Sequence, residues 1–162
     1  MEQLIPLVRL ENGQRVPQHG GKISRIATNL NWQREIVSGN NAMAKGLYFT
    51  AYDHYKIALG IAKSLLKTHQ HHDIVPDNLV PAIVVSYLNI CDLWEKQNKT
   101  TARQGYLCAA FDYLVIQTQT PNLCLDLQEQ LRCGLDKVFV EIVEMGDMEI
   151  IVTNKKILMT LW

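Results

Sequence analysis

The sequence has no excess of charge of either sign, and this absence bears first on the choice of partner. Lys plus Arg number 16, Asp plus Glu also number 16, and the formal net charge is therefore zero. Proteins bind the phosphate backbone through an excess of basic side chains gathered on one face. We therefore do not expect nucleic acid as a partner.

The short motifs that mark common enzymes are also missing. The chain contains no glycine-rich phosphate loop, no nucleophile elbow and no H-E-x-x-H motif. Asp92 with Glu95, and Glu141 with Glu144, are carboxylate pairs three residues apart, a spacing that is more typical of solvated helix surface than of acid–base catalysis. We expect a protein that is not an enzyme and that needs no cofactor.

Long hydrophobic runs and paired cysteines are absent too. Pro6 and Arg9 interrupt the first ten residues, which hold no run long enough for a signal peptide or a membrane span. The cysteines show no C-x-x-C spacing, so we interpret them as reduced thiols in or near the core. These features predict a cytoplasmic protein with no membrane partner. The four cysteines are Cys91, Cys108, Cys124 and Cys133.

Side chains of the metal-ligating type cluster at one place. His69, His71 and His72 precede Asp73, and His54 lies on the segment before them. Zinc needs three or four convergent ligands, and no second cluster follows at a recognisable spacing. A solvated loop is the favoured interpretation and no metal site is assigned. A metal-binding or small-ligand-binding protein remains the last alternative, and convergence of His54 with this loop would favour it.

What the sequence does have is helical periodicity. Its 162 residues are 48% hydrophobic and 20% charged, a size and composition that fit one globular domain. Apolar residues recur at intervals of three and four in five segments. They predict a mainly all-α domain over residues 31–146, with two antiparallel helix pairs and a long fifth helix that caps the stack. The expected N-caps are Asn29 or Asn31, Asp77, Thr100, and Thr120 before Pro121, and Gly146 is expected to end the fifth helix.

The two ends have a different pattern. In the extension 1–30, apolar residues flank Asn12-Gly13, a dipeptide typical of a tight β-hairpin turn. In the tail 147–162, residues 149–153 and 157–161 flank the polar residues 154–156. We expect a short β-hairpin at each terminus. The competing interpretation of the tail is a continued fifth helix or an extra terminal helix.

An internal repeat is the most specific signal. The first pair carries Gly39 on its first helix and then the series Gly46, Tyr48, Ala51, Tyr55, Ala58 and Leu59. This series resembles the turn and second helix of a tetratricopeptide repeat. The second pair matches with Ala102, Tyr106 and Ala109, 51 residues after the equivalent positions of the first, but has Gln97 and Lys99 in place of the glycine and the aromatic. The chain is also similar to small bacterial proteins built from helical hairpins.

The resemblance implies a function as well as a fold. Repeats of this family bind peptides or protein segments along the surface lined by the first helix of each pair. The offset of 51 equates Gln33, Ile36 and Asn40 with Val84, Tyr87 and Cys91, and these six are the candidate partner contacts. For Tyr87 and Cys91, an ordinary place in the core is the alternative.

The chemistry of these contacts indicates the kind of partner. A clamp for a C-terminal carboxylate would need a basic residue, and Asn40 alone fits such a clamp. An apolar or mixed peptide suits Ile36, Tyr87 and Cys91 better. Two hairpins are fewer than the three that a stable stack usually needs, so a homodimer could supply the missing neighbour. A structural or regulatory homo-oligomer is the second functional hypothesis, after a binding module for a protein or peptide partner.

Overall fold

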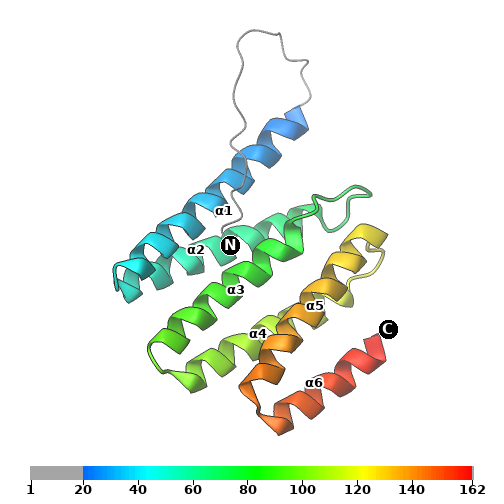
Figure 1. Cartoon of the computed structure of the whole chain (residues 1–162). Coiled ribbons are helices and arrows are strands. Elements are labelled where there is room, and N and C mark those ends of the chain that lie inside the picture. The colour runs from blue at the N-terminus through cyan, green and yellow to red at the C-terminus, as the bar shows by residue number, and fades with distance from the viewer. Residues whose placement is uncertain (1–19, 162) are drawn as a thin grey trace, which may run out of the picture.

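The computed structural model describes the backbone of residues 20–161 and the side chains of residues 30–161. Within this part, the chain forms six helices and no strand, which confirms the all-α prediction (Figure 1). The N-terminal hairpin expected at Asn12-Gly13 lies outside the described residues. The helices are α1 (Gly20–Ala44), α2 (Tyr48–His69), α3 (Leu79–Lys96), α4 (Thr100–Thr118), α5 (Leu125–Met145) and α6 (Met148–Leu161).

The expected C-terminal hairpin is wrong, because α6 occupies this segment. Gly146 ends α5 in a left-handed conformation with φ of 79°, as predicted. The Asp147 Oδ1 atom then accepts hydrogen bonds from the backbone N–H groups of Glu149 (3.1 Å) and Ile150 (3.3 Å). A carboxylate in this position caps a helix N-terminus, so the following β-branched residues form a helix rather than a strand. The competing interpretation of an extra terminal helix is confirmed.

The predicted N-caps are also displaced. Helix α1 begins at Gly20 rather than after Asn29 or Asn31, and α3 begins at Leu79 rather than directly after Asp77. Helix α4 begins at Thr100 itself, and α5 begins at Leu125 rather than after Thr120. The residues that precede α3, α4 and α5 make no side-chain capping hydrogen bond. Before α5, Asn122 has a positive φ of 59°, which keeps Thr120-Pro121 outside the helix. For α4 and α5, the left-handed residues Asn98 and Asn122, rather than a side-chain cap, therefore set the helix start.

The same turn joins the helices of three successive hairpins. Gly46, Asn98 and Gly146 have φ of 72°, 56° and 79°, and each lies two residues before the start of α2, α4 or α6. Glycine and asparagine are the residues that adopt this conformation at least cost. In each turn, the left-handed residue donates its N–H to the carbonyl three residues earlier. The N···O distances are 3.0 Å for Gly46 to Met43, 2.9 Å for Asn98 to Glu95 and 3.0 Å for Gly146 to Val143.

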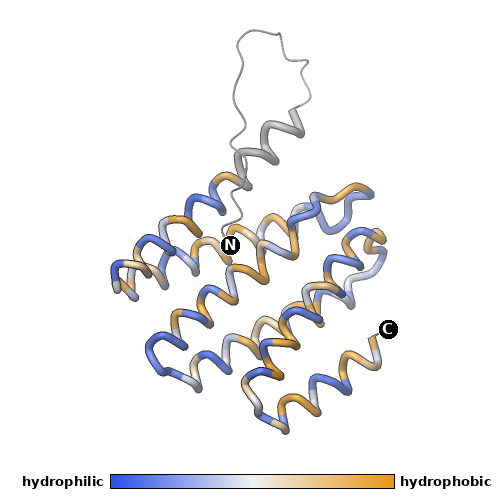
Figure 2. The backbone as a smooth tube through the Cα atoms, in the orientation of Figure 1, coloured by the Kyte–Doolittle hydropathy of each residue, from blue (hydrophilic) through white to orange (hydrophobic). Residues whose placement is uncertain are grey.

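The three hairpins lie in a row (Figure 1). Each helix packs against the next one in the chain, and α3 also packs against α1 and α5. The fifth helix is therefore the first member of a third hairpin and not the final cap that the sequence predicted. Figure 2 shows hydrophobic residues recurring along the central helix α3, whereas the α3–α4 turn is hydrophilic. Four of the fully enclosed side chains of α3 are Val80, Ile83, Ile90 and Leu93.

The first hairpin packs closely around a glycine. Ala51, Tyr55 and Ala58 of α2 are buried, as expected from the repeat pattern. A Cβ atom added to Gly39 of α1 would lie 2.4 Å from Cε1 of the Tyr55 ring. The Tyr55 hydroxyl donates a hydrogen bond of 2.8 Å to Oδ1 of Asn40, back on α1. The absence of a side chain at Gly39 thus makes room for the ring that joins the two helices.

Candidate functional site

The six candidate contacts do not share one surface. Ile36, Val84, Tyr87 and Cys91 are buried in the helical core, and Tyr87 accepts a hydrogen bond of 2.8 Å from the Lys63 ammonium group. Burial also raises the pKa of the Cys91 thiol to about 12. Gln33 and Asn40 are exposed.

The burial of the three α3 candidates has a simple cause in the repeat register. The left-handed residues Gly46 and Asn98 are 52 residues apart, and so are the starts of α2 and α4. The buried residues Leu107 and Ala110 of α4 likewise follow Tyr55 and Ala58 by 52 residues. The residues matched at an offset of 51 are less enclosed, with Tyr106 half-buried and Ala109 exposed. The offset of 51 is therefore wrong by one residue.

A shift of one residue turns a helix by about 100°, so it selects a different face of α3. The corrected offset equates Gln33, Ile36 and Asn40 with Val85, Leu88 and Asp92. Val85 and Leu88 are half-buried and Asp92 is exposed, so this set reaches the surface of α3.

The third hairpin extends the same surface. Gly146 follows Gly46 by 100 residues, and that offset selects Cys133, Asp136 and Val140 on α5, all of them exposed. We call the surface formed by these α3 and α5 residues the α3–α5 face. It consists of Val85, Leu88 and Asp92 on α3 and Cys133, Asp136, Lys137 and Val140 on α5.

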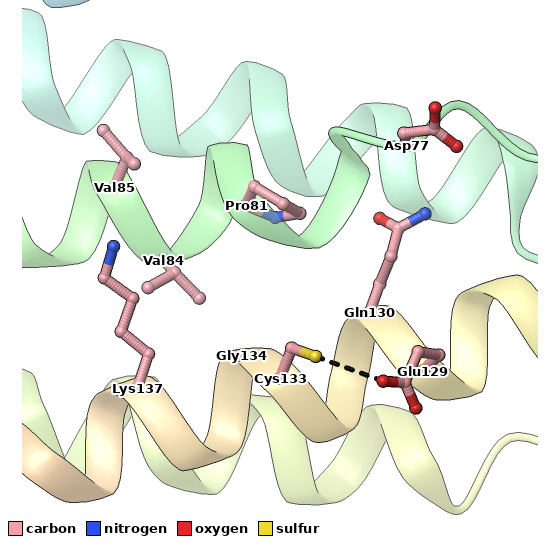
Figure 3. Close-up of a pocket in the computed structure, with 9 residues that line it drawn as sticks. All are labelled: Asp77, Pro81, Val84, Val85, Glu129, Gln130, Cys133, Gly134 and Lys137. Carbon is pink, nitrogen blue, oxygen red and sulfur yellow. Dashed lines mark hydrogen bonds between the residues drawn. The ribbon is translucent and has the colours of Figure 1, made fainter.

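A cavity of about 350 Å³ opens on the α3–α5 face (Figure 3). Val84 lines it and is the one candidate contact from the sequence that does so. Pro81, Val84 and Val85 form its apolar wall on α3, and the side chain of Lys137 lies opposite on α5. The complete lining is Asp77, Pro81, Val84, Val85, Glu129, Gln130, Cys133, Gly134 and Lys137.

Gly134 sets the distance between the two helices at the base of this cavity. A Cβ atom added to Gly134 would lie 2.8 Å from Cγ1 of Val80 and 3.3 Å from Cγ2 of Val84. Both valines belong to α3, so the glycine allows α5 to approach α3 closely. Any side chain at residue 134 would have to push these two helices apart or displace the valines.

Gln130 fixes one end of the cavity. Its Oε1 atom accepts a hydrogen bond of 3.2 Å from the backbone N–H of Val80, and its Nε2 atom donates one of 2.9 Å to the carbonyl of Pro76. One side chain of α5 therefore holds both the start of α3 and the loop before it. This end of the cavity is formed in advance of any ligand.

Charged groups beside the cavity set the protonation state of Cys133. Glu129 accepts hydrogen bonds from Arg132 (2.6 Å) and from the Cys133 thiol (3.4 Å). The bond from Arg132 is the main cause of the lowered pKa of Glu129, and the bond to Glu129 is the main cause of the raised pKa of Cys133. Cys133 is therefore protonated and a poor nucleophile at neutral pH.

Carboxylates gather about one to two helical turns beyond the cavity, toward the C-terminal ends of α3 and α5. Arg103 of α4 reaches Glu95 at 3.9 Å and Glu141 at 3.4 Å. The pKa of Asp92 is raised by desolvation and then by Glu95, and the pKa of Glu141 is raised by desolvation and then by Glu144. Arg103 thus leaves an excess of negative charge at this place, which an incoming cation could offset.

With this geometry established, the comparisons with known proteins place the chain. A family model described as a protein of unknown function, DUF2753, matches residues 30–152. The chain belongs to the DUF2753 family. The matched residues run from α1 into α6, so the region that defines DUF2753 contains all three turns and the α3–α5 face. No curated protein and no solved structure matches the chain.

The four described histidines of this DUF2753 member do not converge on one point. His54 pairs through Nδ1 with Glu35 on α1 at 2.7 Å, and His69 bonds through Nδ1 to the carbonyl of Leu65 at 2.8 Å. Only His72 stacks near His69, with ring centroids 5.3 Å apart. Residues 30–161 contain no group of three or more histidine, cysteine or acidic side chains arranged to hold a metal ion.

No helix in the described part of the chain is long and apolar enough to cross a bilayer.

The α5 side of the site was missed from the sequence because the third hairpin was not recognised. Two glycines and an asparagine, each two residues before the start of a helix, could have revealed it. Gly46, Asn98 and Gly146 give offsets of 52 and 100 residues, and the second of these leads directly to Cys133 and Val140.

Proposed function

We propose that this DUF2753 member is a non-catalytic binding module of tetratricopeptide-like construction that holds a protein segment on the α3–α5 face. The cavity of about 350 Å³ between α3 and α5 is the observation that carries the proposal. Its volume lies in the range of sites that enclose a small ligand or a large side chain. The repeated turn at Gly46, Asn98 and Gly146 supports a repeat architecture, in which such surfaces receive peptides.

The lining of the cavity indicates what the segment carries. Pro81, Val84 and Val85 suit a large apolar side chain, which would be withdrawn from water on binding. Asp92 and Glu141, with their raised pKa values, lie in a carboxylate cluster that a Lys or Arg side chain would relieve. The proposed partner is therefore a peptide segment with an apolar anchor and a basic residue next to it.

A phage-displayed library of random dodecapeptides, panned on the full chain, tests this proposal. We expect enrichment of sequences that combine an aromatic or large aliphatic residue with Lys or Arg. The affinity of one enriched synthetic peptide is then measured by fluorescence anisotropy. Val85→Glu places a charge in the apolar wall and should weaken binding at least tenfold. Asp92→Lys should weaken it several-fold by reversing the local charge.

Ile57→Glu is the matched control, because Ile57 is an exposed aliphatic residue on α2, away from the α3–α5 face. This variant should bind the peptide like the wild type. Circular dichroism should give equal helical content for all three variants. A panning experiment that enriches no peptide, or a peptide whose binding is unaffected by Val85→Glu, would overturn the proposal.

A further inference from the structure

The outer side of α6 carries a row of side chains that nothing in the described chain covers. Met148, Val152, Lys155 and Met159 follow one another at intervals of four, three and four residues, so they lie on one side of the helix. Met148 is 67% exposed, Val152 45% and Met159 75%. We call these four residues the α6 stripe.

In the first two hairpins, the position equivalent to Val152 contacts the hairpin that follows. Val152 is equivalent to Tyr52 of α2 and to Gln104 of α4. The Tyr52 ring packs against Trp94 of α3, with centroids 5.6 Å apart. The Gln104 Nε2 atom donates a hydrogen bond of 3.0 Å to Asp147, which lies in the turn of the third hairpin. At this position α6 has an apolar side chain, and no hairpin among the described residues packs over it.

Met159 is also exposed at a position where the other two hairpins have a buried residue. Its equivalents are Leu59 of α2, which is 5% exposed, and Phe111 of α4, which is fully buried. A methionine that is 75% exposed at a position buried twice elsewhere in the fold indicates a contact surface without its partner.

At the opposite end of the row, the described part of α1 carries polar residues at two positions that are buried in α3. The buried α3 residues Ile83 and Tyr87 are equivalent to Asn31 and Glu35 of α1. Asn31 accepts a hydrogen bond from Arg34, and Glu35 pairs with His54, so this side of α1 is polar. At these two positions of α1, the apolar α6 stripe of another copy would meet polar side chains, which disfavours an open head-to-tail chain through this side of α1.

We propose that two copies of this chain associate through antiparallel pairing of their α6 helices about a twofold axis. This arrangement places Met148 opposite the partner subunit's Met159. It also places Val152 beside the aliphatic part of the partner subunit's Lys155, whose charged end can reach water. The spacing of the stripe is that of the a and d positions of a short coiled coil.

Charge complementarity fixes the antiparallel direction. Glu149 and Lys156 are exposed, lie seven residues apart beside the stripe, and form no ion pair within the described residues. In the antiparallel pair, each Glu149 faces the partner subunit's Lys156, so the symmetry creates this contact twice. In a parallel pair in register, equal residues lie side by side, so Glu149 of one copy would lie about 10 Å along the helix from the partner subunit's Lys156 and could not pair with it.

Sedimentation velocity over a wide range of protein concentration tests the proposal on the full chain. We expect the wild type to form dimers in a concentration-dependent manner and Val152→Glu to remain a monomer. Ile116→Glu is the control, because Ile116 is an exposed aliphatic residue on α4 outside the stripe, and its dimerisation should be unchanged. A wild type that stays monomeric at all concentrations, or a Val152→Glu variant that dimerises normally, would overturn the proposal.

An exchange of charges tests the direction of pairing. Glu149→Lys and Lys156→Glu should each raise the dimer dissociation constant about tenfold, because each replaces two attractive contacts with two repulsive ones. The double variant Glu149→Lys/Lys156→Glu should restore the wild-type value. A double variant that is as weak as the single ones would refute the antiparallel register. Peptide binding on the α3–α5 face is expected to be unaffected in all these variants, so failure of either proposal can be recognised separately.

Discussion

The first and third hairpins have the same turn but differ in how tightly their two helices pack. In the first, the Tyr55 ring fills the space left by Gly39, its hydroxyl bonds to Asn40, and His54 pairs with Glu35. In the third, the positions equivalent to Tyr55 and Gly39 are the exposed Lys155 and the half-buried Phe139. A repeated turn sets the direction of the chain, whereas the residues at these two positions decide how closely the helices approach.

The first and third hairpins also differ in the side chains that they leave exposed at the two ends of the row. The first hairpin buries one side of its second helix and carries the polar residues Asn31 and Glu35 on its first. The third hairpin keeps an apolar row exposed on α6, at Met148, Val152 and Met159. Within the described residues, the polar positions Asn31 and Glu35 of α1 thus contrast with the apolar positions of α6, and this contrast supports the proposed pairing through α6.

The largest expected effect comes from removing the close approach in the first hairpin. Gly39→Ala places a methyl group 2.4 Å from the Tyr55 ring, which is buried and cannot move aside freely. We expect the free energy of unfolding to fall by about 3 kcal/mol, at the upper end of the range for overpacking. Urea denaturation followed by circular dichroism measures the change.

The matched control is Gly60→Ala. Gly60 also lies inside a helix, but a Cβ atom there would meet nothing within 4 Å. This substitution should leave stability unchanged or raise it by up to about 1 kcal/mol through helix propensity. Equal effects of the two substitutions would show that Gly39 has no special packing role.

A smaller effect is expected where the second hairpin meets the third. Gly134→Ala brings a methyl group to 2.8 Å from the buried side chain of Val80. We expect a loss of about 1–2 kcal/mol in unfolding free energy, reduced by the gain in helix propensity. Because Gly134 lines the cavity, peptide affinity should fall in the same variant. Gly105→Ala, at an open position on α4, should change neither quantity for the worse.

The sequence was sufficient to predict the first five helices, α1 to α5, since each has apolar residues at helical spacing. It was misleading in the tail, where the β-branched residues Ile151, Val152 and Thr153 favour a strand on composition alone. The Asp147 cap outweighs that preference, but its importance depends on Gly146 ending α5 immediately before it. The turn and cap formed by Gly146 and Asp147 therefore outweigh the strand propensity of residues 151–153.

The site was harder to predict than the fold because it depends on register. Tyr106 and Ala109 imitate the spacing of Tyr55 and Ala58, yet the residues that fill the equivalent buried positions are Leu107 and Ala110. The repeat pattern expects an aromatic residue at the position of Tyr55, and because the second hairpin has Leu107 there, the offset of 52 was not recognised. An error of one residue leaves a helix prediction intact but replaces a surface face with a buried one.

A further prediction concerns the α6 stripe. Lys155 is the one charged member of the α6 stripe, and a lysine at such a position weakens a helix pair while helping to fix its register. Lys155→Leu should therefore lower the dimer dissociation constant about tenfold, as measured by sedimentation velocity. Lys67→Leu, on the exposed side of α2, is the control and should leave the dissociation constant unchanged. If both substitutions tighten the dimer equally, general hydrophobicity rather than the stripe is responsible.

The smallest expected effect concerns the carboxylates between the second and third hairpins. The pKa of Asp92 is raised above its usual 3.8, so the folded state binds this proton more tightly than the unfolded state does. The stability that Asp92 contributes is therefore present at low pH and lost as pH rises through the raised pKa. Because Asp92 is exposed, Asp92→Asn should increase stability by only about 0.5 kcal/mol at pH 7.

Thermal unfolding of Asp92→Asn and wild type between pH 3 and pH 7 measures this difference, which should shrink toward zero at the acidic end. Glu129→Gln gives the opposite sign, because its hydrogen bond from Arg132 lowers the pKa of Glu129. That variant should be less stable than the wild type at pH 7 and approach it as the pH falls. Opposite slopes would show that the cavity has a satisfied carboxylate at one end and unsatisfied carboxylates beyond the other, which is the asymmetry that the proposed binding of a basic peptide requires. Parallel slopes would remove the electrostatic basis for that orientation.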